Sequence, residues 1–369
     1  MSSAANKRLG FIDATRSIAI IMMLQGHFIA STFKDYFPME AQLKTTWASG
    51  SRIFDIWLIA RGFTAPLFFT ITGLVFVYLL GRNQDEPFFK QKRVRKGIKR
   101  GLLVIAWGYF LQLNVKSLHV YMDGRLNSRF FLFHVLQSIG FGILALIIIY
   151  GLFKIIKKLR FSIILLIAAL LVFGFAPAIS GSESYVPKGA HEIIQNMFKG
   201  PNSGFPLFPW LGYVLFGGAI GSFIRESGDR IHGKWFPLKL LGLVFFISLV
   251  GRIALLAIYG KLDAPFGWHN DLDSFDRLIL VVLLIVGLMY FERKFGIRDS
   301  LFIRMGQNTL VIYIVHVILL YGAVIGIGVK TFWYHELSGW QSALGAIVFI
   351  GFFALMTWVQ NRVKLRIRN

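Results

Sequence analysis

The sequence predicts an all-α polytopic membrane protein, a bundle of about ten transmembrane helices with both termini in the cytoplasm. Of its 369 residues, 56% are hydrophobic and 16% are charged, and the mean hydropathy is +0.62. The apolar residues form segments of about 18 to 25 residues, enough to cross a hydrocarbon core of about 30 Å. Basic residues gather in alternate loops between these segments. A water-soluble domain needs none of these features.

The first apolar segment is expected to be a retained helix rather than a signal peptide. It is long, it begins with Asp13 and Arg16, and no small-x-small cleavage site follows it. No Pro/Gly/Ser-rich linker of domain-separating length interrupts the later segments, so we expect a single transmembrane domain over residues 1–369. In chain order, the expected helices are residues 11–33, 62–81, 97–114, 130–152, 161–179, 206–224, 236–259, 275–292, 302–327 and 341–361.

The net charge of +22 is explained by membrane topology. The basic residues are concentrated in the loops on one side, and the positive-inside rule places that side, with both termini, in the cytoplasm. We therefore expect a multi-pass protein of the inner cell membrane, with the lipid bilayer as its partner and no nucleic acid partner. The densest run of basic residues comprises Arg82, Lys90, Lys92, Arg93, Arg95, Lys96, Lys99 and Arg100.

The composition also limits the chemistry. Cysteine is absent, which excludes a disulfide framework and thiolate catalysis. No histidine cluster and no Cys/His spacing indicates a metal site, so we expect no metal.

His27 is the first candidate for a catalytic base, because it lies in an otherwise apolar helix. Counted from Phe11 at about 1.5 Å per residue, it falls in the outer third of the bilayer. An ionisable side chain in a spanning helix is costly and often marks a functional site. The alternative is a histidine that is hydrogen-bonded between packed helices. Asp13 and Arg16 share one helical face near the inner boundary, where they pair with each other or Arg16 meets an anionic ligand.

Further polar residues accompany the later helices. The second helix begins with Arg61 and Thr64, and its hydroxyl and small residues either pack against other helices or line a tunnel. The fourth helix carries His134 and Gln137 on one face near the outer boundary. Two more groups are Asn308, which precedes His316 by eight positions, and Asp276 at the outer boundary.

Taken in order, these motifs resemble a known family. The chain is similar to the catalytic domain of heparan-α-glucosaminide N-acetyltransferase and its bacterial relatives, within the wider transmembrane acyltransferase superfamily. The resemblance runs from about residue 8 to 325. The motifs that carry it are Asp13-x-x-Arg16-Ser17-x-Ala19-Ile20…Met23…His27, Phe63-Thr64-Ala65-Pro66-Leu67-Phe68-Phe69…Gly73, Val135-Leu136-Gln137-x-Ile139-Gly140, Phe208-Pro209-Trp210-Leu211-Gly212 and Gly306-x-Asn308-Thr309-Leu310-x-x-Tyr313-x-x-His316.

The resemblance implies a single transmembrane acyltransferase-like domain of ten or eleven helices. Acetyl-CoA would arrive from the cytoplasm, and the acetyl group would pass to a sugar or glycan amine or hydroxyl on the other side. By analogy, His27 takes the active-site position. Lysosomal members look to have asparagine there and a histidine in the following loop, but this chain has no histidine from Phe28 to Trp107. This departure favours His27 acting alone over a covalent acetyl-enzyme.

The expected roles follow from the chemistry of attack on a thioester. His27 would take the acceptor's proton, which contributes about 10²–10⁴-fold. The oxyanion donor would be Gln137, Asn308 or a free backbone amide, and we place His316 with these catalytic residues. Arg61, Thr64, His134 and Asp276 would contact the acceptor. Cations would hold the coenzyme A phosphates, or else serve only orientation and lipid headgroups; these are Arg16, Arg93, Arg95, Lys96 and Arg100.

Two other classes of function remain open. A transporter or flippase for a sugar- or lipid-linked substrate would also suit a bundle with broken helix starts. Ion coupling usually needs carboxylates near the midplane, whereas Asp13, Asp276 and Glu292 fall at helix ends. A degenerate family member acting as a scaffold would not bind acetyl-CoA. The acceptor, the acylated atom, the acyl chain length, direct transfer and the oligomeric state, a homodimer included, stay undecided.

Overall fold

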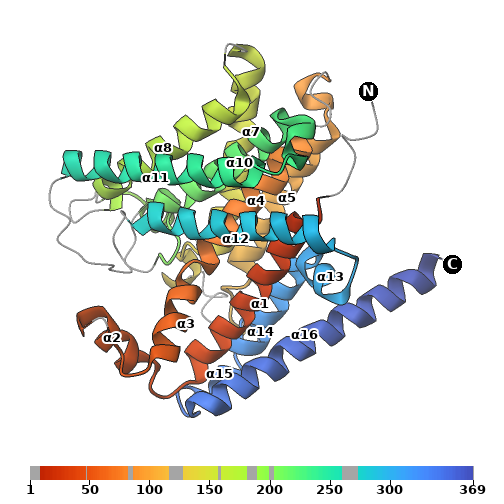
Figure 1. The fold of residues 1–369 in the computed structure, drawn as a ribbon. Helices are drawn as coiled ribbons and strands as arrows, with labels where there is room; N and C mark the ends of the chain where they lie inside the picture. Colours follow the sequence, from red (N-terminus) through yellow and green to blue (C-terminus); the bar gives the residue numbers. More distant parts are fainter. Residues whose placement is uncertain are drawn as a thin grey trace. The chain divides into compact units, whose positions relative to one another are not determined.

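The described residues of the computed structural model form α-helices and a few short 3-10 turns (Figure 1). It describes residues 9–46, 48–81, 86–115, 128–156, 159–180, 189–198, 203–259 and 273–368. In these residues, backbone pairing outside the helices consists of loop bonds and two isolated parallel bridges, Phe33 with Leu337 and Asn114 with Val324. Arg82 of the expected basic run lies outside the described residues.

The chain divides into two compact units. The first unit comprises the described parts of Pro66–Leu113 and His119–Val286. The second comprises those of Arg8–Ala65, Asn114–Leu118 and Gly287–Asn369. The expectation of a single domain therefore stays a prediction.

In the first unit, α10 packs against α8 and α7, and α5 packs against α7. Glycines allow α4 and α10 to meet backbone to backbone, since a Cβ at Gly73 would lie 2.8 Å from the amide nitrogen of Gly218. No side chain fits such an approach. Two helices belong to this unit only in part, α4 (Thr64–Leu80) from Pro66 onward and α12 (Asp273–Phe295) as far as Val286. The others are α5 (Lys92–Phe110), α7 (Val135–Ile156), α8 (Phe161–Ser180), α9 (Glu192–Phe198), α10 (Leu207–Glu226) and α11 (Phe236–Tyr259), with short 3-10 turns at Phe88–Lys90, Ser128–Phe131 and Gly228–His232.

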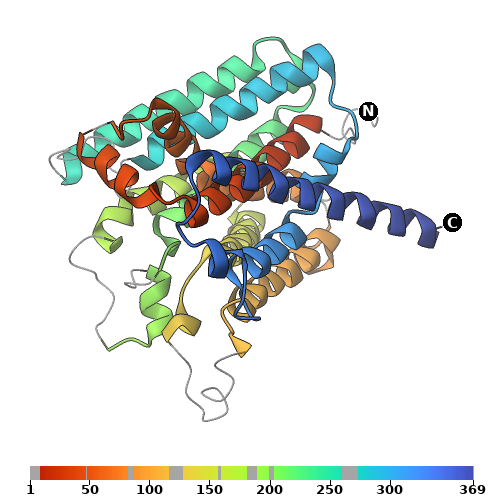
Figure 2. The same cartoon turned by 90° about the horizontal axis from the view of Figure 1, so that it is seen from below.

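In the second unit, α1 is the central helix. It packs against α3, α13, α14, α15 and α16, and the two views agree that α16 runs beside it (Figures 1 and 2). Its buried face includes Phe11, Ala19, Ile20 and Leu24. The helices are α1 (Gly10–Thr32), α2 (Tyr36–Thr46), α3 (Arg52–Gly62), α13 (Leu301–Gln307), α14 (Thr309–Tyr321), α15 (Val329–Trp333) and α16 (Gly339–Arg368).

Seven helical segments of the described residues are long and apolar enough to cross a membrane, or eight if α13 and α14 count as one broken span. The first and third expected spans form helices α1 and α5 but fall outside this group, because α1 carries polar residues along its length and α5 begins in the basic run. The expected number of about ten spans and the cytoplasmic termini thus stay predictions. The seven are Arg52–Leu80, Val135–Ile156, Phe161–Ile179, Leu207–Glu226, Phe236–Tyr259, Ser274–Phe295 and Gly339–Val363.

The expected helix over residues 302–327 is broken. Helices α13 and α14 meet at Asn308 with a bend of 83°. The Asn308 side chain donates to the Arg304 carbonyl (3.2 Å), a local bond of the kind that competes with helix continuation. Helix α14 then ends at Tyr321, because Gly322 adopts a left-handed conformation (φ 70°). The sequence-based prediction of one continuous helix was wrong at both points.

Candidate active site

The N-terminus of α1 is held by Glu292, a residue of α12 that belongs to the same unit. Its carboxylate accepts the backbone N–H of Gly10 (2.7 Å) and of Phe11 (2.9 Å). Both amides lie in the first turn, where a helix has no internal acceptors for its N–H groups. The negative charge also complements the positive end of the helix dipole. Glu292 therefore fixes the start of the helix that carries His27.

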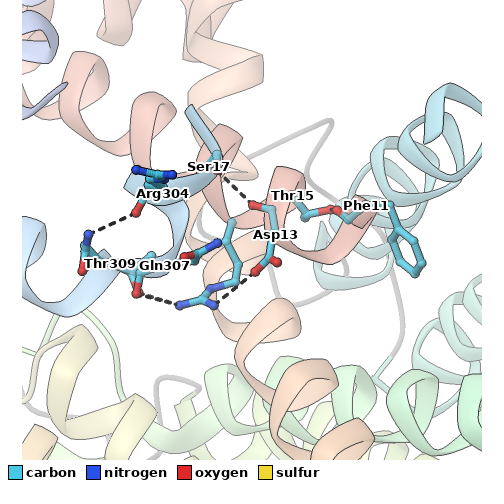
Figure 3. Close-up of polar contacts among 9 residues, drawn as sticks. Phe11, Asp13, Thr15, Ser17, Arg304, Gln307 and Thr309 are labelled. Carbon is cyan, nitrogen blue, oxygen red and sulfur yellow. Dashed lines mark hydrogen bonds and ion pairs between the residues drawn. The ribbon is translucent and has the colours of Figure 1, made fainter. Parts of the chain in front are cut away.

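One turn further along, the polar residues of α1 face the break between α13 and α14. The Arg16 guanidinium lies 3.6 Å from an Asp13 carboxylate oxygen. It also donates to the hydroxyl of Thr309 (3.3 Å) and to the Gln307 carbonyl (3.5 Å). Figure 3 labels Asp13, Gln307 and Thr309 at this break. Arg16 thus has partners inside the protein, and it ties α1 to the bend. The expected pairing of Arg16 with Asp13 is present, and contact with an anionic ligand stays a prediction.

Gly306 lets α13 lie directly on this part of α1. A Cβ at this position would lie 2.7 Å from the Ser17 amide nitrogen and 2.8 Å from the Asp13 carbonyl oxygen. The Ser17 hydroxyl is satisfied within α1, since it donates to that same carbonyl (3.0 Å). The contact is therefore one of close backbone packing, and glycine is required for it.

At the other end of α1, two ring side chains lie against the candidate base. Nδ1 of His27 lies 2.6 Å from the hydroxyl oxygen of Tyr321, and the two rings meet edge to face with centroids 5.8 Å apart. The ring of His316 lies 5.4 Å from that of His27. His316 is buried, whereas His27 is only partly buried. The structure therefore brings together two of the predicted catalytic residues and leaves one of them accessible.

His316 is placed by its own helix. Tyr313, one turn earlier on α14, packs its ring edge to face with the imidazole at 4.9 Å. Nδ1 of His316 forms no hydrogen bond of good geometry within the described part of the chain. A buried polar atom without a partner is uncommon and marks a position that warrants a functional test.

Arg61 approaches this end of α1 from α3. Its guanidinium donates to the phenol oxygen of Tyr36 (2.6 Å) and lies over the Tyr36 and Trp57 rings at 5.4 and 5.9 Å. Its Cγ lies 3.4 Å from where a Cβ of Gly26 would stand, so the side chain crosses α1 next to His27. Trp57 is itself fixed, because its indole N–H donates to Gln25 on α1 (2.6 Å).

Tyr36 is an acceptor that keeps its own proton. Burial raises the pKa of its phenol to about 12, although the nearby Arg61 cation opposes the shift. The phenol is therefore neutral at physiological pH, and the Arg61 charge is not cancelled by it. An uncancelled cation beside an imidazole suits an anionic or strongly polar ligand.

Asn308 and Thr64 occupy different places in this unit. Asn308 lies at the bend, where its amide is used by the Arg304 carbonyl. Thr64 is buried, and its hydroxyl has no hydrogen-bond partner among the described residues. Their proposed roles as oxyanion donor and acceptor contact stay predictions.

The remaining predicted site residues belong to the first unit. The Gln137 amide oxygen accepts the backbone N–H of His134 (3.3 Å), and Asp276 forms an ion pair with Arg252 (2.9 Å). Arg93 lies over the Phe76 ring at 5.9 Å. The exposed cations of α5 are Lys92, Arg95, Lys96, Lys99 and Arg100. The roles predicted for these residues, as oxyanion donor, acceptor contacts and coenzyme A phosphate contacts, stay predictions.

Two functional candidates escaped the sequence reasoning, Tyr321 and Glu292 in its capping role. Tyr321 follows His316 by five positions, a spacing that puts it more than one turn away, and nothing in the sequence indicates its contact with His27. The sequence shows Glu292 only as a carboxylate at a helix end, and it does not reveal the contact with the amides of Gly10 and Phe11. In the described part of the chain, no group of three or more His, Cys, Asp or Glu side chains is arranged to hold a metal ion.

The fold and the site define a multi-pass membrane protein with an accessible imidazole among polar side chains. The chain belongs to the heparan-alpha-glucosaminide N-acetyltransferase family, because the model of that family's catalytic domain matches residues 8–260. The match includes His27, Arg16 and Arg61 and ends before His316 and Tyr321. Membership implies a transferase enzyme.

A second comparison finds a more distant likeness to another membrane enzyme. The phospho-N-acetylmuramoyl-pentapeptide-transferase of Carboxydothermus hydrogenoformans is 26% identical over 157 residues. That stretch covers 42% of this chain and 43% of the relative. The chain therefore spans less than half of that relative, and the likeness assigns it no activity.

Proposed function

We propose that this protein is an acetyltransferase of the inner cell membrane that moves an acetyl group from cytoplasmic acetyl-CoA to a sugar or glycan outside the cytoplasm. Family membership supports the reaction class. The single observation that supports the site is the contact of His27 with Tyr321, next to Arg61 and His316. An imidazole held in this way is suited to general base catalysis.

The contact with Tyr321 suggests which nitrogen acts. When Nδ1–H of His27 donates to the Tyr321 oxygen, the lone pair of Nε2 is free to take a proton from the acceptor. The acceptor nitrogen or oxygen then bonds to the thioester carbonyl carbon, and the carbon–sulfur bond breaks. Coenzyme A leaves as a thiol after it receives the proton that His27 took. No proton or electron is left over, and no metal is required.

The phosphates of acetyl-CoA need cations. The exposed cations of α5 can supply them, with Arg93 partly buried at the start of that helix. Arg16 has donors in the second unit that suit the same ligand class. Arg61, Thr64, His134 and Asp276 remain the proposed acceptor contacts, Gln137 and Asn308 the proposed oxyanion donors, and a homodimer a proposed assembly.

The first experiment measures thiol release from acetyl-CoA by detergent-purified protein with glucosamine-containing acceptors. The chain has no cysteine, so a thiol reagent reports coenzyme A without background from the protein. Wild type is compared with His27→Ala and His27→Gln. We expect both variants to lose about 10²–10⁴-fold in turnover while they still bind acetyl-CoA.

Three other outcomes of these measurements would contradict the proposal. Full turnover by both variants would remove His27 from the mechanism. Wild-type protein that binds no acetyl-CoA would contradict the enzyme as a whole. The broken helix at Asn308 is a feature that transporters share, so sugar movement into vesicles without acetyl-CoA would favour a transporter or flippase instead.

A further inference from the structure

A cavity lies in the second unit, between the start of α13 and the end of α16. Its volume is about 330 Å³, and its polar lining comprises Asp299, Ser300, Arg304, Trp358, Asn361 and Arg362. On α16, Trp358, Asn361 and Arg362 stand at positions i, i+3 and i+4, which places them on one helical face. None of these residues belongs to the proposed acetyl-transfer site.

The two guanidinium groups of this cavity differ in their partners. Arg304 is held by Asp299 through contacts of 2.9, 3.2 and 3.3 Å. Arg362 lies over the Trp358 ring at 5.3 Å, and it forms no ion pair with the carboxylates of the described residues. The cavity therefore keeps the positive charge of Arg362 and attracts an anion.

Asn361 adds a donor. Its amide nitrogen is buried and has no hydrogen-bond partner within the described part of the chain. Most buried donors in proteins are paired, so this one is suited to a ligand that supplies an acceptor oxygen. A guanidinium and an amide N–H on one helix face are the donors that a phosphate group takes.

The surroundings indicate that the phosphate belongs to a lipid. Helix α16 is apolar enough to span a membrane as far as Val363, so Trp358 and Arg362 lie where a span meets the headgroup region. Apolar side chains next to the cavity are exposed, including Leu355 and Val359 on α16 and Leu301 on α13. A soluble nucleotide leaves these apolar side chains in water, whereas acyl chains cover them.

We infer that this cavity binds the phosphate of an anionic phospholipid through Arg362 and Asn361. Trp358 would lie at the level of the glycerol backbone, as indole rings do at membrane interfaces. The Arg304–Asp299 pair would form the wall that limits the headgroup's size. This lipid site is independent of acetyl transfer and stands if that proposal fails.

The test is native mass spectrometry of the full-length protein in detergent, titrated with dioleoyl-phosphatidylglycerol. The variants are Arg362→Gln and Asn361→Leu. The control is Arg298→Gln, which removes the same charge from an exposed residue that does not line the cavity. We expect Arg362→Gln to weaken the tightest lipid adduct about tenfold and Asn361→Leu to weaken it severalfold, with Arg298→Gln unchanged.

Three outcomes would overturn the inference. If Arg298→Gln and Arg362→Gln weakened lipid binding equally, the binding would depend on general surface charge and not on this cavity. Displacement of the lipid by coenzyme A or inorganic phosphate at equal concentration would assign the cavity to a soluble phosphate. The absence of any retained phosphatidylglycerol on the wild-type protein would contradict the lipid site itself. Unchanged melting temperatures in all three variants are required for the comparison.

Discussion

Nδ1 of His27 and the hydroxyl oxygen of Tyr321 are 2.6 Å apart, although 294 positions separate the two residues in the chain. This contact defines the direction of the imidazole. A histidine with one nitrogen engaged can use only the other for chemistry. Under the proposed acetyl transfer, the phenol therefore decides which imidazole nitrogen is left for the acceptor.

The Tyr321 hydroxyl is therefore expected to act as a positioning group. Tyr321→Phe keeps the edge-to-face ring contact with His27 and removes the hydroxyl that lies 2.6 Å from its Nδ1. We expect kcat to fall about tenfold while KM for acetyl-CoA is unchanged, since one hydrogen bond that orients the base is lost. Tyr334→Phe, at an exposed tyrosine under Lys330, serves as the control. A fall in both variants alike would point to a general effect on this surface.

Arg61 is expected to select the acceptor. Lysine cannot reproduce both the bond to Tyr36 and the stacking on Trp57, so Arg61→Lys should raise KM for the acceptor about tenfold and leave acetyl-CoA binding intact. Tyr36→Phe should have a smaller effect in the same direction. Because the pKa of Tyr36 is about 12, its phenol stays protonated from pH 6 to 9, and the ratio of the variant's KM to that of wild type should be flat across this range.

The Glu292 cap is expected to contribute to stability. Glu292→Gln removes a charge and one acceptor from the amides of Gly10 and Phe11, which should cost about 1–2 kcal/mol of unfolding free energy. Unfolding followed by intrinsic tryptophan fluorescence in detergent measures the change. Glu336→Gln, which removes a carboxylate away from this helix start, should have a smaller effect. No difference between the two would show that α1 needs no cap.

The two glycines Gly306 and Gly351 make a matched pair. A methyl group at Gly306 would press on the backbone of α1, so Gly306→Ala should destabilise the protein by about 1–3 kcal/mol. Nothing lies within 4 Å of a Cβ at Gly351, in the middle of α16. Gly351→Ala should therefore be neutral or stabilising by up to about 1 kcal/mol, because alanine is the better helix former. Equal melting temperatures for the two variants would contradict the close approach of α13 and α1.

Most helices could be predicted because the length of each apolar run can be counted in the sequence. Residues 161–179 and 236–259 were expected as spans and form α8 and α11. The break at Asn308 could not be predicted this way, since an apolar run continues after it. It depends on whether the Asn308 side chain donates to the Arg304 carbonyl, and hydrophobic length does not reveal that bond. The second span was expected to begin at residue 62, whereas its apolar segment begins at Arg52 and is interrupted at Phe63.

The candidate site was predictable only in part. His27 and His316 could be chosen because ionisable residues in apolar helices are conspicuous. Their proximity could not be derived, because it depends on how α14 packs beside α1. Tyr321 was missed for the same reason, since a tyrosine at the end of an apolar helix is ordinary interfacial composition. The structure thus adds the partners of His27, and the enzymology of these residues is the next test.

The packing of α1 against α13, α14, α15 and α16 also has a consequence for biosynthesis. The first helix leaves the ribosome long before these four helices, so His27 has no phenol partner while most of the chain is still being made. The polar residues of α1 therefore stay without these partners, in the membrane or in the translocation machinery, until the residues beyond Gly287 have been synthesised. The site therefore matures last. A ribosome-stalled chain that ends before Tyr321 should insert into the membrane without catalytic competence.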